Sequence, residues 1–207
     1  MHSNITRRHF IQAAGLAITI AGQNLSLRGM KSLQESDEQG VVEIDITNNY
    51  RIGRWYFDPV GVHLQPGDKV RWICRKWGGS ATAFHPANGN HELRIPEDAQ
   101  SFDSGILMDR GMVGSSFEWV FEEEGTYDFF SRNHERLGAV GRIVVGSPGG
   151  PGEKLPGYGG RDGRAPMFAE SAKLLSWLGT DRIIQDRIVR YPLDLLKRRF
   201  PIQENAF

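Results

Sequence analysis

The sequence has little sulfur chemistry and no excess of either charge. Cys74 is the one cysteine among 207 residues, which excludes an internal disulfide and the thiolate clusters of structural zinc and iron–sulfur sites. The 25 basic and 25 acidic side chains cancel, which argues against a protein built mainly to bind nucleic acid. What the chain does have is 25 glycines and 39% hydrophobic residues, a composition typical of a turn-rich β protein with one core.

The first thirty residues have the order of an export signal. Arg7 and Arg8 precede Phe10 and Ile11, as in the twin-arginine motif, and an apolar run continues to Ala21. This run is shorter than the ~20 apolar residues that span a bilayer, but it suits the central segment of a signal peptide. We therefore expect a twin-arginine signal segment at 1–30 and a linker at 31–40. This predicts a periplasmic or other extracytoplasmic protein, membrane-anchored if the signal is uncleaved; the alternative is an ordinary amphipathic N-terminal helix.

Residues 41–146 are predicted to form one β domain. Apolar and polar residues alternate in short runs at 41–46, 60–64, 69–74, 116–121, 126–131 and 142–145. Asn48-Asn49 and Pro66-Gly67-Asp68 have turn compositions between the first of these runs. Such short period-2 runs, separated by turns, predict an antiparallel sandwich or barrel. The following segment, 147–164, is rich in Gly and Pro and is expected to be a flexible linker.

The last segment, 165–207, is predicted to be a helical C-terminal extension. Apolar residues recur at helical spacing before Gly179: Phe168, Leu174, Leu175 and Leu178. Residues 181–190 predict a second helix with its isoleucines on one side, and 193–200 a third short turn. We expect these helices to pack on the sandwich or on a second subunit, so they are the expected surface for a protein partner or self-association. Membrane-surface binding is the less favoured alternative, because Asp186 and Asp194 interrupt the basic face.

Several motifs within 41–146 follow one another in a recognisable order. They are Trp55-Tyr56-Phe57-Asp58-Pro59, Pro66-Gly67-Asp68-Lys69-Val70-Arg71-Trp72, Arg94-Ile95-Pro96, Phe102-Asp103-Ser104-Gly105, Gly125-Thr126-Tyr127-Asp128-Phe129-Phe130 and Gly138-Ala139-Val140-Gly141-Arg142-Ile143. Over about half of the chain, this order resembles the plastocyanin-like cupredoxins, particularly halocyanin-type exported domains. The resemblance implies an all-β fold, a cupredoxin Greek-key β-sandwich of seven or eight strands, to which the α-helical extension is added.

The resemblance also implies where a metal site would lie. In that family two histidines, one cysteine thiolate and a weak axial methionine hold a blue copper ion that transfers electrons. Three of these ligands follow the pattern Cys-x-x-His-x-x-x-x-Met, and the corresponding positions here are Ser131, His134 and Ala139. The other histidine precedes a strand that 80–84 matches, which makes Gly79 its counterpart. His134 is therefore the one ligand retained, and Gly79, Ser131 and Ala139 are degenerate ligand positions.

Other side chains offer poor replacements for the missing ligands. His85 lies six residues beyond Gly79, about 20 Å of extended chain, so it cannot substitute without a large change of register. His85 and His91 together are a weak candidate pair for a divalent metal. Cys74 shares a strand face with Val70 and Trp72, which favours a buried, inert thiol over a replacement thiolate. We expect no bound cofactor, with copper as the alternative that the family implies.

The sequence gives no support to an enzymatic function. It contains no Gly-x-Ser-x-Gly, no phosphate-binding loop and no His-Glu-x-x-His. The prediction is an exported cupredoxin-fold protein of the blue-copper electron-transfer family that has lost its type 1 copper site and acts as a binding or assembly module. The alternative is a copper-binding electron-transfer protein that uses His134 and unconventional ligands.

Overall fold

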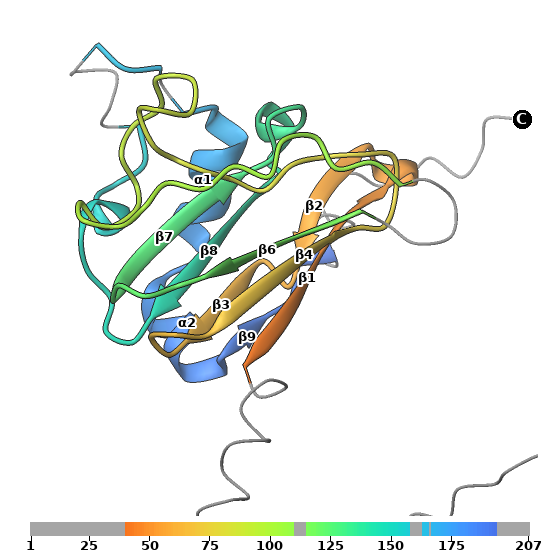
Figure 1. The fold of residues 1–207 in the computed structure, drawn as a ribbon. Helices are drawn as coiled ribbons and strands as arrows, with labels where there is room; N and C mark the ends of the chain where they lie inside the picture. Colours follow the sequence, from red (N-terminus) through yellow and green to blue (C-terminus); the bar gives the residue numbers. More distant parts are fainter. Residues whose placement is uncertain (1–39, 110–114, 158–162, 166, 194–207) are drawn as a thin grey trace, which may run out of the picture. The chain divides into compact units, whose positions relative to one another are not determined.

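Two β-sheets face each other in the computed structural model, which describes residues 40–109, 115–157, 163–165 and 167–193 (Figure 1). The first sheet has the order β2-β1-β4-β6, with β2 at Arg54–Asp58, β1 at Val41–Asn49, β4 at Lys69–Cys74 and β6 at Ser116–Val120. The second has the order β5-β7-β8-β3-β9, with β5 at Thr82–Ala83, β7 at Gly125–Phe130, β8 at Val140–Val145, β3 at Gly61–Leu64 and β9 at Ile188–Val189. The predicted β-sandwich is confirmed. The predicted signal segment, 1–30, lies outside the described residues.

The main core lies between the two sheets and is centred on aromatic rings. Alternation along β4 directs Val70, Trp72 and Cys74 into it, and all three are fully buried. The Trp72 ring centroid lies 5.4 Å from that of Phe102 and 5.5 Å from that of Phe129. Aromatic pairs at such distances add to the stability gained from apolar burial. The expectation that Cys74 is a buried core thiol is confirmed.

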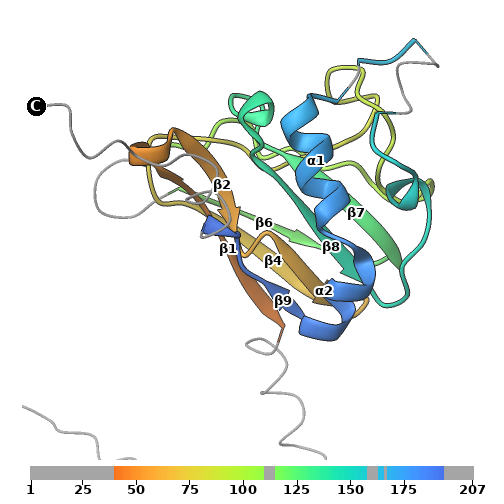
Figure 2. The same ribbon diagram turned by 180° about the vertical axis from the view of Figure 1, so that it is seen from behind.

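Two helices cover the outer face of the second sheet, as Figure 2 shows. They are α1, at Ala169–Trp177, and α2, at Thr180–Asp186. Leu175 packs against Val140 of β8, and Leu178 and Ile183 pack against Val144 of the same strand. Every residue of β8 is buried for this reason, since one face meets the core and the other meets the helices. The predicted helical extension is thus a small addition of two short helices, and its predicted third turn falls largely on undescribed residues.

The second predicted helix, 181–190, is wrong in its last part. It ends at Asp186, Arg187 has a left-handed φ of 59°, and Ile188–Val189 forms β9 instead. The backbone N–H of Val60 donates to the Val189 carbonyl at 2.8 Å, and that of His63 to the Arg187 carbonyl at 2.8 Å. Ile188 is therefore exposed, and Val189 occupies the buried side. Hydrogen bonding to β3 outweighed the local helical pattern.

The predicted antiparallel pairing holds for five pairs of the described strands but is wrong for two, and the predicted turn at Asn48-Asn49 is wrong. β1 pairs with β4, and β3 with β8, in parallel, so both sheets are mixed. Asn48 and Asn49 continue β1, where they oppose Trp55 and Arg54 of β2. The chain reverses one step later, in a 3-10 turn, η1, at Tyr50–Ile52 that ends on Gly53 with a φ of 62°. Alternation shows that a strand exists but contains no information about its partner.

Part of the segment predicted as a linker, 147–164, packs against the sandwich. A 3-10 turn, η3, at Pro151–Glu153 buries Pro151 and Gly152. A Cβ atom at Gly152 would lie 2.6 Å from the backbone oxygen of Thr126, so only glycine allows this close approach. Glu153 accepts hydrogen bonds from Thr126 of β7 and from Thr180 of α2. This segment therefore connects the sheet to the helices.

A buried ionic network holds these parts together. Asp128 of β7 accepts 2.7 Å hydrogen bonds from Arg94 and from Arg142 of β8. Both guanidiniums also donate to the Gly152 carbonyl, at 2.8 and 3.1 Å, and Arg142 donates to the Leu178 carbonyl at the end of α1. Arg94 and Asp128 are fully buried and Arg142 nearly so. Because burying charge is costly, the network is stable only while each member keeps its partners.

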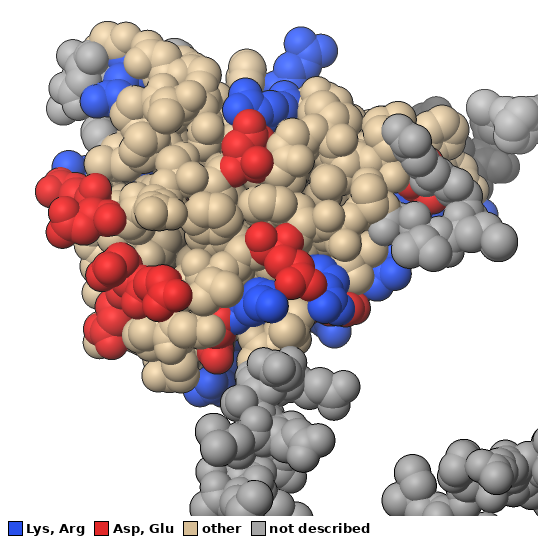
Figure 3. All heavy atoms as spheres, in the orientation of Figure 1, with Lys and Arg blue, Asp and Glu red and all other residues tan. Residues whose placement is uncertain are grey.

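The outer face of the first sheet is polar. Arg71 of β4 pairs with Glu118 of β6 at 2.6 Å and with Glu43 of β1 at 3.2 Å, and Arg75 pairs with Asp45 at 2.8 Å. Figure 3 shows basic and acidic side chains both present on the side of the molecule that it displays.

Within the described ranges, none of the helices has the length and apolar character that crossing a membrane requires.

Replacing Asp128 by Asn should destabilise the protein strongly. Arg142 would lose its carboxylate partner and Arg94 would keep only that of Glu92, and breaking a buried ion pair in this way costs about 3–5 kcal/mol. Urea unfolding followed by circular dichroism measures the change. Asp98→Asn, at an exposed position, is the control and should change stability by less than about 0.5 kcal/mol. An Asp128→Asn protein as stable as the control would contradict the role given to the network.

Candidate functional site

The loop between β7 and β8 brings three of the predicted site positions together. Ser131 follows β7, and its N–H donates to the carbonyl of Ala139 at 2.9 Å. The N–H of His134 donates to the Ser131 carbonyl at 2.9 Å, and the N–H of Ala139 donates to the His134 carbonyl at 3.2 Å. A 3-10 turn, η2, at Glu135–Leu137 lies between, and Gly138 ends it with a φ of 86°. These backbone hydrogen bonds close the loop on itself.

Gly79 lies directly beside Ser131, although the two are far apart in the sequence. The N–H of Ser80 donates to Ser131 Oγ at 3.2 Å. A Cβ atom at Gly79 would lie 3.2 Å from the same oxygen and 2.6 Å from Ile46 Cγ2 of β1. The structure therefore gathers Gly79, Ser131, His134 and Ala139 into one cluster, and Ile46 fills the space where a side chain at position 79 would begin.

His134 is half-buried and held by aromatic stacking. Its ring lies 4.9 Å from that of Trp55, with an angle of 11° between the planes, and its Nδ1 is 3.5 Å from Ser131 Oγ. Burial lowers the pKa of His134 below its ordinary value, because desolvation penalises the charged imidazolium. The imidazole is therefore neutral at pH 7, the form in which histidine accepts hydrogen bonds or ligates metals.

The other two histidines considered from sequence belong to a different part of the molecule. His85 Nδ1 accepts a hydrogen bond from the N–H of Ala87 at 3.1 Å, within its own turn. His91 Nε2 lies 3.5 Å from Glu135 Oε2. Burial lowers the pKa of both imidazoles, and a neighbouring arginine adds to the effect in each case. His91 thus contacts a carboxylate rather than the cluster around Ser131.

Cys74 cannot act as a ready thiolate. Its Sγ is directed to the carbonyl of Lys76 at 3.8 Å, and the residue has no exposed surface. Burial raises the pKa of the thiol, so the protonated form predominates at neutral pH.

Next to the cluster around Ser131 lies a series of hydrogen-bonded side chains that the sequence analysis did not identify. The N–H of Arg132 donates to Ser80 Oγ at 2.9 Å, Ser80 contacts Thr82 Oγ1 at 2.9 Å, and Thr82 donates to Asp103 Oδ1 at 2.9 Å. Arg132 Nη2 closes the ring to Asp103 Oδ2 at 2.6 Å. Burial opposes ionisation of Asp103, but hydrogen bonds from Arg132 and Thr82 hold its pKa below the ordinary value. The polar residues at alternate positions 80 and 82 were the available signal.

Comparisons with known proteins give both sequence relatives and structural neighbours. No protein-family model matches the chain. A pseudoazurin from Methylorubrum extorquens is 26% identical over 139 residues, which cover 67% of this chain and 77% of that protein.

Two solved structures illustrate the structural neighbours. A pseudoazurin from Methylobacterium extorquens AM1 has a TM-score of 0.46 at 23% identity, covering 67% of this chain and 95% of its own. A purple cupredoxin from Nitrosopumilus maritimus has a TM-score of 0.38 at 23% identity, covering 51% and 99%. The sequence similarity to pseudoazurin supports a relation to the cupredoxins, and a two-sheet sandwich is the architecture that such a relation predicts.

Proposed function

We propose that this chain is an exported cupredoxin-fold protein, derived from halocyanin-like blue-copper electron carriers with a Greek-key sandwich, that no longer holds type 1 copper. It would serve as a binding or assembly module rather than as an enzyme. The similarity to a pseudoazurin supports the family, and the meeting of Gly79, Ser131, His134 and Ala139 at one place supports the assignment of the four positions.

The side chains of the cluster do not fit a type 1 copper ion. Ser131 supplies a protonated hydroxyl, a hard donor that cannot replace the soft thiolate copper requires, and it already accepts a hydrogen bond from Ser80. Gly79 has no side chain, and Ala139 ends in a methyl group. Within the described ranges, no group of three or more His, Cys, Asp or Glu side chains could hold a metal. The observation that carries the proposal is the packing of Ile46 against Gly79, which leaves no space for a ligand side chain.

The alternative is a copper protein that uses His134 with unconventional ligands. One observation favours it: His134 is half-buried in the loop where the family places a ligand, and burial lowers its pKa, which favours the neutral imidazole. An imidazole alone does not distinguish copper from other first-row metals, so such a site would need further donors to select its ion.

The proposed role includes a location and a contact surface. Export by a twin-arginine signal at 1–30 would place the protein in the periplasm. The apolar sides of α1 and α2 are already covered by the second sheet. A protein partner, or a second copy of the chain, would therefore contact the outward side of the helical extension.

Metal analysis separates the proposal from its alternative. The full chain, purified from its native compartment, should contain far less than one copper per molecule and show no intense thiolate-to-copper absorption in the visible range. Elemental analysis and absorption spectroscopy measure both quantities. Stoichiometric copper with the visible band would overturn the proposal, and stoichiometric copper without it would support the alternative with a histidine-based site.

Rebuilding the ligand set tests the four positions. The variant Gly79→His, Ser131→Cys, Ala139→Met should bind little copper, because Ile46 blocks the new histidine. Adding Ile46→Ala should allow uptake with a visible thiolate band. The same four-residue variant with Ser131 restored is the control and should lack the band. A folded four-residue variant that never binds copper would count against the assignment.

Ser131→Ala tests whether the hydroxyl has become structural. The buried N–H of Ser80 would lose its acceptor, which costs about 1–3 kcal/mol of unfolding free energy. Ser176→Ala on the exposed side of α1 is the matched control, because its hydroxyl bonds only within the helix. Urea denaturation compares the two, and equal stabilities would show that Ser131 Oγ has no structural role.

A further inference from the structure

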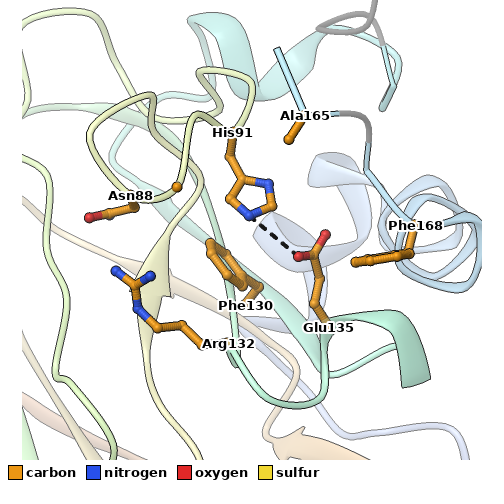
Figure 4. A pocket seen from close by; sticks show the side chains of 8 residues that line it. Asn88, His91, Phe130, Arg132, Glu135, Ala165 and Phe168 are labelled. Atoms are coloured by element: carbon orange, nitrogen blue, oxygen red, sulfur yellow. Dashed lines mark ion pairs between the residues drawn. The ribbon is translucent and has the colours of Figure 1, made fainter.

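A pocket with a volume of about 450 Å³ lies beside the loop 131–139 (Figure 4). His91 comes from the segment after β5, Phe130 from the end of β7, Glu135 from η2 and Phe168 from the residue before α1. Its volume falls within the ~300–1,000 Å³ of small-molecule sites. Like such sites, it combines apolar walls with a few polar groups.

Two polar atoms of this pocket, one on His91 and one on Glu135, lack hydrogen-bond partners in the described structure. His91 Nε2 approaches Glu135 Oε2 at 3.5 Å, and Figure 4 shows the pair between Ala165, Phe130 and Phe168. The second oxygen, Glu135 Oε1, and the second ring nitrogen, His91 Nδ1, are buried and have no hydrogen-bond partner in the described structure. Leaving such atoms unsatisfied costs about 1–3 kcal/mol each, so a ligand that supplies hydrogen-bond donors would recover that free energy.

The position of Glu135 is fixed by its surroundings. Only 4% of its surface is exposed, and its backbone carbonyl accepts a hydrogen bond from Ser171 of α1. Burial, to which the charge of Glu92 adds against the N–H of Phe168, raises the pKa of Glu135 to about 7. Among the described residues, His91 is the one ion-pair partner of this carboxyl, and no lysine or arginine is paired with it.

The arginine at the pocket is paired with a different carboxylate. Arg132 lines the pocket, but its guanidinium is bound to Asp103 at 2.6 and 3.3 Å. The pocket wall thus contains Arg132, which is already paired with Asp103, and the Glu135–His91 pair, in which two atoms have no hydrogen-bond partner.

We propose that this pocket binds a small molecule with a primary ammonium group on an apolar or aromatic body. An ammonium has three N–H donors, which suit a carboxyl oxygen and a ring nitrogen that both accept hydrogen bonds. The ring of Phe168, which is 48% exposed at the pocket, attracts a cation and covers its apolar body, and the buried Phe130 adds to the apolar lining. An anionic ligand would be repelled by the carboxylate of Glu135. A hydrocarbon would leave Glu135 Oε1 and His91 Nδ1 without hydrogen bonds. The inference uses none of the copper-ligand positions and does not depend on the proposed function.

Titration calorimetry at pH 7 on the full chain tests the chemistry of the ligand. The probe is 2-phenylethylamine, compared with 2-phenylethanol and 3-phenylpropionate, which have the same aromatic body. The amine should bind with 1:1 stoichiometry and at least tenfold more tightly than either analogue. Absence of saturable binding of the amine, or equal binding of the alcohol, would overturn the proposal.

Two variants locate the binding. Glu135→Gln should weaken amine binding at least tenfold, while Glu97→Gln, at an exposed position, should leave it unchanged. Phe168→Ala gives a second test that does not depend on the buried carboxyl, because Phe168 is 48% exposed at the pocket wall. It should weaken binding several-fold, with exposed Leu155→Ala as its control. The location would be refuted if Phe168→Ala bound the amine with wild-type affinity and Glu135→Gln either did the same or failed to fold.

Discussion

The buried contact of Asp128 with Arg94 and Arg142 is the interaction on which the rest of the structure depends. It lies on the outer face of the second sheet, where three charges would be intolerable without partners. The guanidiniums complete their hydrogen bonds with carbonyls of η3 and of the end of α1. Satisfying the charges therefore requires the segment after β8 to return over the sheet.

That return also positions the loop 131–139 of the candidate site. Once α1 is docked, Ser171 holds the backbone of Glu135, and the loop 131–139 is fixed from outside as well as by its own backbone hydrogen bonds. Trp55 of β2 stacks on His134 from the other side. The loop is thus held by hydrogen bonds and by aromatic stacking among the described residues.

Adjacent residues of this loop serve two different environments. His134 lies against Trp55 and Ser131, in the cluster where Ile46 fills the available space. Glu135 contacts His91 instead and lines the pocket together with Phe168, the residue before α1. The 3-10 turn η2 begins at Glu135, directly after His134, so two consecutive side chains enter different environments. A change in one environment therefore need not disturb the other.

By itself, the sequence determined the local features of this protein. Alternation located β4 at 69–74, because it is a property of neighbouring residues. Gly79, Ser131, His134 and Ala139 were assigned as site positions through resemblance to a family. The parallel strand pairs, β9, the Asp128 network and the His91–Glu135 pocket were decided only by the tertiary structure. Each of these depends on a partner distant in sequence, and local periodicity carries no information about which distant groups will meet.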